Sequence, residues 1–195
     1  MSSGYHISDQ HSTYFVTFTL VGWLDLFTRK ECKDIIIGSL QYCQKNKGLI
    51  IYAYVLMESH LHLVATAKDG SKGLSAIIRD FKKFTSLKII DWINDNPTES
   101  RRDWLKMVFK YHGKYNQNNK HFQVWQQHNM PKICLQPKFT IQKINYIHNN
   151  PVVTGIVDNP ADYRYSSARN YEGRKDYILD VIVLDYGPQV GYVRI

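Results

Sequence analysis

The sequence predicts an α+β fold, an antiparallel sheet backed by helices on one face. Threonine, valine and phenylalanine are frequent in Ser12–Val21, which favours a strand. Lys30–Lys47 carries apolar residues mainly at three- and four-residue spacing, the period of an amphipathic helix. Two further apolar, β-branched segments, Leu49–Met57 and His60–Ala67, are predicted strands joined by the short polar turn Glu58-Ser59.

A second helix follows, with an apolar stripe and a basic side. The stripe consists of Leu74, Ile77, Ile78, Phe81, Phe84 and Leu87. Arg79, Lys82 and Lys83 lie on the other side. These basic residues form either an ordinary solvated face or one wall of a nucleic-acid groove, and for a single helix the solvated face is the default interpretation.

The segment Asn94–Asn119 is polar, charged and weakly periodic. It is predicted to be a long loop with a short helix around Trp104–Tyr111. A loop of this kind can lie over a substrate.

Length and charge restrict the class of protein. A chain of 195 residues suits a single domain with a short polar N-terminal segment and a C-terminal tail from about residue 174. Lysine and arginine outnumber aspartate and glutamate by 25 to 17, for a net charge of +8. A basic surface favours a polyanionic partner, most commonly nucleic acid, although excess charge also serves solubility.

Three scattered cysteines, Cys32, Cys43 and Cys134, show no Cys-x-x-Cys spacing and are interpreted as reduced thiols. Met1–His11 is polar, without the apolar core of a signal peptide, and no apolar run reaches membrane-spanning length. We therefore expect a cytoplasmic protein that does not act on membranes.

Two histidines, His60 and His62, stand one residue apart in an apolar strand. Alternate side chains of a strand share a face, so both imidazoles point the same way, roughly 7 Å apart along the backbone. Histidine is the commonest protein metal ligand, and a pair on a rigid strand makes half of a small coordination sphere. The alternative interpretation is a structural pair, and this motif alone favours it.

Tyr146 lies in a segment that is typical of the last turns of a helix. Ile141, Ile144 and Ile147 recur at three-residue spacing, and Pro151 followed by Gly155 should end the helix. A tyrosine near the end of a helix is held at a fixed position along the helix axis. Taken alone, Tyr146 is most simply a packed aromatic with its hydroxyl at the surface.

Several motifs taken together resemble the single-tyrosine HUH transposases, the small insertion-sequence transposases and their REP-associated tyrosine relatives. They extend from about Ser12 to Gly173 and are His60-Leu61-His62, Phe81-Lys82-Lys83-Phe84-Thr85, Val124-Trp125-Gln126, Tyr146 to Val152, and Asp162 to Tyr171. Glu58 and Ser59 precede the histidines where the family often has proline and asparagine. Each motif alone is weak, but all of them in this order are specific.

The resemblance implies a ferredoxin-like or RRM-like HUH nuclease core, with the histidines on a central strand and the tyrosine helix beside the open sheet face. It also implies a transposase that cuts and rejoins single-stranded DNA, with Tyr146 as the nucleophile. Cleavage would leave a 5′-phosphotyrosine, and a free 3′-hydroxyl would then attack it. The expected substrate carries a hairpin, and both a monomer and a homodimer fit the family.

A divalent ion, Mg²⁺ or Mn²⁺, is the expected cofactor at His60 and His62. Two nitrogen ligands suit Mn²⁺ better, and Mg²⁺ is abundant in the cell. Asn150 is the predicted third ligand, because it lies four residues after Tyr146 on the same helix face, whereas His148 faces away. If the helix ends early, His148 is the alternative ligand.

Nucleic-acid contacts are expected from Arg79, Lys82, Lys83 and Arg164. Aromatic residues interleave with basic ones in places, as in Tyr163-Arg164-Tyr165, and such pairs stack unpaired bases while holding phosphates. Most aromatics are nevertheless expected in the core.

Two other classes of function remain open. A catalytically inactive or domesticated relative would still recognise hairpin DNA through its basic surface, but intact His60, His62 and Tyr146 argue against it. A metal-binding or RNA-binding ferredoxin-like module would not need the tyrosine, and an RRM would show its aromatic signature on the sheet.

Overall fold

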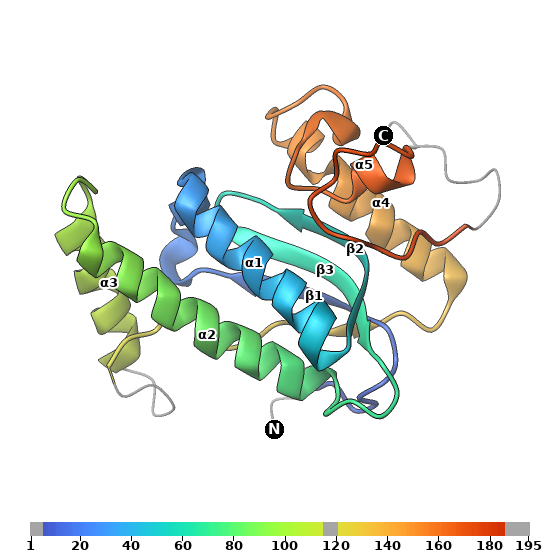
Figure 1. Cartoon of the computed structure of the whole chain (residues 1–195), viewed down its shortest axis with the longest axis horizontal. Coiled ribbons are helices and arrows are strands. Elements are labelled where there is room, and N and C mark those ends of the chain that lie inside the picture. Colours follow the sequence, from blue (N-terminus) through green and yellow to red (C-terminus); the bar gives the residue numbers. More distant parts are fainter. Residues whose placement is uncertain (1–5, 115–120, 186–195) are drawn as a thin grey trace.

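The computed structural model describes residues 6–114 and 121–185, and Figure 1 shows their arrangement. The elements in chain order are β1 (Tyr14–Thr19), the 3₁₀ turns η1 (Val21–Trp23) and η2 (Leu26–Thr28), α1 (Lys30–Lys47), β2 (Leu49–Leu56), β3 (His60–Ala67), α2 (Leu74–Asp95), α3 (Arg102–Lys114), β4 (Lys132–Ile133), α4 (Pro137–Val153), η3 (Pro160–Asp162) and α5 (Ala168–Tyr171).

The four strands form one antiparallel sheet in the order β2-β3-β1-β4. With α1 between β1 and β2, and α2 between β3 and β4, this is the β-α-β-β-α-β pattern of ferredoxin-like folds. The predicted α+β class and the antiparallel sheet are confirmed. β3 lies between β2 and β1, so the histidine strand is central, as expected.

The two faces of the sheet bury different side chains. Leu61 and Leu63 of β3 join the larger core cluster, to which α1 and α2 contribute. Val64, on the alternate face, packs with Ile144 and Ile147 of α4 in a second cluster. Figure 1 shows α1 along the sheet and α4 on the far side of β2. His60 and His62 share the face of Val64, because alternate residues of a strand point the same way.

The free edge of β2 is covered by a later segment of the chain. Leu56 N–H donates to the Tyr165 carbonyl at 2.9 Å, and Ser167 N–H donates to the Tyr54 carbonyl at 3.0 Å. Farther along, Ile182 N–H donates to the Ile51 carbonyl at 2.9 Å. Residues 165–182 therefore satisfy backbone groups that an edge strand would otherwise expose.

Helices extend beyond two of the predicted boundaries. The predicted loop Asn94–Asn119 is wrong over much of its length, because α2 continues to Asp95 and α3 occupies Arg102–Lys114. α3 buries Leu105 and Phe109, which lie one turn apart, so a single narrow apolar stripe is enough to hold it. None of the described helices is both long and apolar enough to span a membrane.

The tyrosine helix α4 continues two residues beyond Pro151, to Val153, and ends before Gly155, as the sequence predicts. Proline lacks an N–H and so removes a single backbone hydrogen bond from the last turn. The turn is closed beyond it, where Thr154 N–H donates to the Asn150 carbonyl at 3.1 Å and the Thr154 hydroxyl donates to the same oxygen at 3.0 Å.

Candidate active site

His60 and His62 lie side by side on β3, with ring centroids 4.7 Å apart. His62 is buried, and its Nδ1 lies 2.8 Å from Thr17 Oγ1 on the paired strand β1. The other ring nitrogen, Nε2, is also buried and has no hydrogen-bond partner within residues 6–114 and 121–185. If Nδ1–H donates to Thr17, Nε2 carries a free lone pair, which is the form of imidazole that binds a metal.

Ser59 contacts His60 in the way that Thr17 contacts His62. Its hydroxyl oxygen lies 3.1 Å from His60 Nδ1, so Nε2 is the ring nitrogen of His60 that Ser59 does not contact. Both histidines thus hold a hydroxyl at Nδ1, an arrangement that fits ligation of one divalent ion through two Nε2 atoms. Ser59, one of the two departures from the family pattern, therefore supports a histidine directly.

Burial keeps both imidazoles neutral at pH 7. The pKa of His62 is lowered to about 3, mainly by burial and also by the nearby His60 and Lys143. Burial also lowers the pKa of His60. Because a metal ligand must be unprotonated, neither ring would have to lose a proton before binding an ion at neutral pH.

Tyr146 points its ring at this histidine pair from α4. The ring centroids of Tyr146 and His62 are 5.2 Å apart in an edge-on arrangement, and Phe15 contacts both rings. Tyr146 is 49% exposed, so it is not the packed core aromatic of the simplest interpretation. Its side chain is accessible next to the candidate metal ligands, as a nucleophile must be.

The continuation of α4 through Asn150 puts this residue on the same helix face as Tyr146, one turn further on. Its side chain is half-buried. Among the described residues, no group of three His, Cys, Asp or Glu side chains is placed to bind a metal. Asn150 stays the predicted third protein ligand.

His148 is built into the interior. The ring is buried, its Nε2 lies 2.8 Å from Ser167 Oγ, and it contacts the Tyr171 ring edge-on at 4.8 Å. Burial lowers the pKa of His148 to about 3. These contacts give His148 a packing role that ties α4 to the segment that covers β2.

Lys143 is a site residue that the sequence interpretation missed. Its ammonium lies over three rings, 5.2 Å from the Phe15 centroid, 5.1 Å from Phe139 and 5.8 Å from Tyr146. Burial is the main cause that lowers its pKa, and the described surroundings contribute no carboxylate. The available signal was its position three residues before Tyr146, which places both on neighbouring helix turns.

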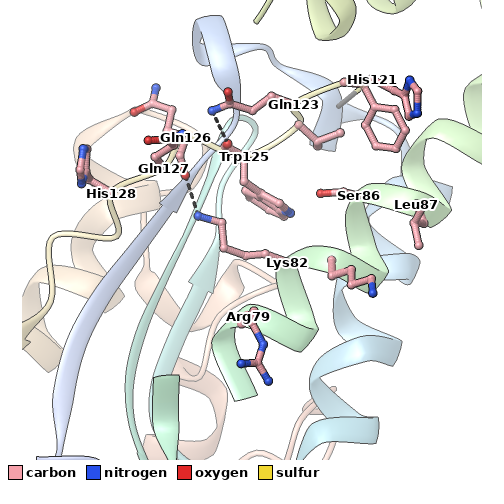
Figure 2. A pocket seen from close by; sticks show the side chains of 13 residues that line it. Arg79, Lys82, Ser86, Leu87, His121, Gln123, Trp125, Gln126, Gln127 and His128 are labelled. Carbon is pink, nitrogen blue, oxygen red and sulfur yellow. Dashed lines mark hydrogen bonds between the residues drawn. The ribbon is translucent and has the colours of Figure 1, made fainter. Parts of the chain in front are cut away.

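Arg79, Lys82 and Lys83 line a cavity of about 690 Å³ between α2 and residues 121–128 (Figure 2). None of the described lining residues is acidic. Lys82 reaches across, as Figure 2 shows, and donates to the Gln126 carbonyl at 2.6 Å; it also donates to Asn129 Oδ1 at 2.9 Å. Burial lowers the pKa of Lys82 to about 8. Lys82 thus joins α2 to the segment that contains Gln126 and Asn129, whereas Arg79 and Lys83 are exposed.

The four predicted nucleic-acid residues do not form one patch. The cavity borders the β1 side of the sheet, where Trp125 bridges to Leu20. Arg164 is exposed at the opposite edge, next to the segment that pairs with β2. The structure therefore brings three of these residues together and leaves Arg164 apart.

Three of the motifs that resemble the family hold the fold together. Thr85 Oγ1 accepts a hydrogen bond from Trp125 Nε1 at 2.9 Å, which joins the α2 motif to the Val124-Trp125-Gln126 motif. In the third motif, Tyr163 donates to the Leu56 carbonyl at 2.7 Å and Tyr171 donates to the Tyr52 carbonyl at 3.0 Å. These hydroxyls bind along β2, so their role is in positioning and not in chemistry.

Comparison with known proteins gives a structural relative. No protein-family model matches this chain, and no curated protein matches it by sequence. Among solved structures, a REP-associated tyrosine transposase bound to a REP hairpin matches with a TM-score of 0.65 and 19% identity, over 100% of this chain and 99% of that one. The shared feature at this identity is the fold, and it extends over the full length of both chains.

Proposed function

We propose that this protein is a transposase that cuts and rejoins single-stranded DNA through a phosphotyrosine at Tyr146. The observation that carries the proposal is the buried Nε2 of His62, which has no hydrogen-bond partner in the described part of the chain. The ring of His62 lies beside His60 and in contact with the exposed Tyr146. The fold shared with a REP-associated tyrosine transposase supports it. A purely structural histidine pair would not need a buried ring nitrogen that accepts no hydrogen bond and lies beside an accessible phenol.

The roles of the chain's own side chains follow from their contacts. Tyr146 would attack the scissile phosphorus, the bond from phosphorus to the 3′-oxygen would break, and that oxygen would take up a proton as the phenol loses one. The product is a 5′-phosphotyrosine and a free 3′-hydroxyl. Rejoining is the reverse attack by another 3′-hydroxyl, so no external energy source is required.

His60, His62 and Asn150 would hold a divalent ion, Mn²⁺ or Mg²⁺, which when bound supplies a Lewis acid for a non-bridging phosphate oxygen. Thr17 and Ser59 keep the two imidazoles oriented. Lys143, over the Tyr146 ring, would neutralise charge on the phosphate during attack.

The DNA would be single-stranded with a hairpin, and the structural relative is itself bound to a REP hairpin. We assign the cavity lined by Arg79, Lys82 and Lys83 to phosphate contacts, because no acidic residue lines its described part. Arg164 would contact a separate part of the strand. We place the reaction in the cytoplasm, in keeping with three unpaired cysteines, and we assign the active species to a monomer or homodimer.

The direct test is covalent trapping. Single-stranded hairpin DNA with a 3′ label is incubated with Mn²⁺ or Mg²⁺, and a denaturant-resistant protein–DNA adduct is expected. Tyr146→Phe should abolish the adduct while DNA binding persists, and Tyr42→Phe, an exposed tyrosine on α1, is the matched control. Mass spectrometry that finds DNA on another residue would refute the assignment of Tyr146.

Metal dependence and substrate class are tested in the same system. The His60→Ala, His62→Ala double variant should form no adduct, and cutting by this variant in chelator would contradict the metal site. Binding should favour hairpin-bearing single strands over plain duplex and weaken steeply with salt, since phosphate contacts release counterions. Equal binding of plain duplex at all salt concentrations would contradict the proposed substrate.

A further inference from the structure

Trp23 stands at the edge of the candidate active site with its indole in solvent. It ends η1, directly after β1, and its side chain is 63% exposed. Its ring centroid lies 5.9 Å from that of His60, in an edge-on arrangement. The rings of Trp23, His60, His62 and Tyr146 thus form a continuous series of contacts with the most exposed ring at its end.

The backbone at this point is in an unusual conformation. Gly22 has φ of 62° and Trp23 has φ of 54°, so two consecutive residues are left-handed. Glycine adopts this region freely, but a bulky aromatic residue does so only where its surroundings require it. Such outliers collect at functional sites.

Hydrogen bonds on both sides keep the turn in this form. Trp23 N–H donates to the Leu20 carbonyl at 3.1 Å, and Leu24 N–H donates to the Val21 carbonyl at 3.4 Å. Val21 is buried, and its N–H donates to the Val124 carbonyl at 2.9 Å. The turn is therefore anchored in the core while it presents a large apolar ring to solvent.

We infer that Trp23 is a stacking platform for an unpaired DNA base next to the scissile phosphate. The inference rests on the proposed function and specifies how the substrate is held. Every base has an apolar face, and a fixed indole offers a matching one with little loss of conformational entropy. An unpaired strand whose phosphate lies at Tyr146 and the histidines has bases free to reach an exposed ring beside His60.

The test measures DNA affinity without chemistry. In a Tyr146→Phe background and in chelator, fluorescence anisotropy gives the Kd for a labelled hairpin with a single-stranded extension. Trp23→Ala should raise the Kd about 5- to 150-fold, the range that one stacked base accounts for. Trp23→Phe should restore most of the affinity. Trp104→Ala is the matched control, since Trp104 is also exposed but lies on α3, and its Kd should not change.

A scan of abasic positions makes the test specific to stacking. Removal of each base of the extension in turn should reveal one position where the parent protein loses affinity and where Trp23→Ala adds no further loss. An unchanged Kd for Trp23→Ala, or an equal effect of Trp23→Ala at every abasic position, would overturn the stacking role. If the protein with Tyr146 intact forms the adduct in such a case, the proposed function stands. If that protein binds no single-stranded DNA, both proposals are overturned.

Discussion

Mild acid should destabilise the fold through its buried histidines, and the contribution of His148 can be isolated. Its imidazole is fully buried, with Nε2 bonded to Ser167, and burial lowers its pKa to about 3. In the unfolded chain the pKa of histidine is about 6.5. Between these values the unfolded state binds more protons than the folded state. The contribution of His148 to the free energy of unfolding is therefore fully present above pH 6.5, and it decreases as the pH falls toward 3.

The size of the effect follows from the two pKa values. At pH 5 the unfolded histidine is 1.5 pH units below its pKa, and at about 1.4 kcal/mol per unit this costs the folded state about 2 kcal/mol. Buried His62 acts in the same direction, because its pKa is also lowered to about 3. A comparison of the parent with His148→Gln cancels the His62 contribution. Glutamine does not titrate and can still form a hydrogen bond with Ser167.

The assay is urea unfolding followed by circular dichroism at pH 7.5 and pH 5.0, in chelator so that metal binding does not contribute. His148→Gln should be less stable than the parent at pH 7.5, because the buried ring is lost. Its loss of stability between the two pH values should be smaller than that of the parent by about 2 kcal/mol. Equal losses in the two proteins would refute the reasoning that His148 is kept neutral by burial.

Three further predictions concern metal and DNA. Asn150→Ala should weaken Mn²⁺ affinity about 10-fold or more by calorimetry, whereas His148→Gln should change it little; the reverse ranking would make His148 the third ligand. Thr17→Val removes the partner of His62 Nδ1 and should weaken Mn²⁺ affinity about 10- to 100-fold, whereas Thr17→Ser should bind Mn²⁺ almost as well as the parent. If the valine variant binds Mn²⁺ as tightly as the parent, Thr17 does not support the metal site. DNA affinity should fall as the pH rises through about 8, where Lys82 loses its charge, and Lys82→Arg should flatten that dependence in a binding titration. A parent protein with no such dependence would exclude Lys82 from phosphate binding.

Local sequence patterns predict elements well where one period dominates. Lys30–Lys47 and His60–Ala67 match the structure at both ends, since helical and strand periods are each continuous there. α3 was missed as a full helix because Leu105 and Phe109 are its main buried side chains and most of its other residues are exposed. β4 has only two residues and depends on its contact with β1, which no local pattern reveals.

The candidate site was found by resemblance more than by physics. His60 and His62 are recognisable from the alternation of a strand, but the contact of His62 with Tyr146 depends on long-range packing of α4. Thr17 was missed because its pairing with His62 depends on the register between β1 and β3, which local sequence patterns do not predict. Trp23 was missed because a strained, exposed indole has no periodic signature.

The segment that covers β2 also limits how two copies of this chain can associate. An open edge strand can pair with other chains through its free backbone N–H and C=O groups. In β2, backbone groups at this edge already form hydrogen bonds with residues 165–182. A continuous intermolecular sheet across β2 would first require that segment to detach, with loss of the hydrogen bonds between Ser167 and Tyr54 and of the one that the Tyr171 hydroxyl donates to the Tyr52 carbonyl. A homodimer, if formed, is thus directed to another surface, and aggregation by strand addition at this edge is suppressed within the folded state.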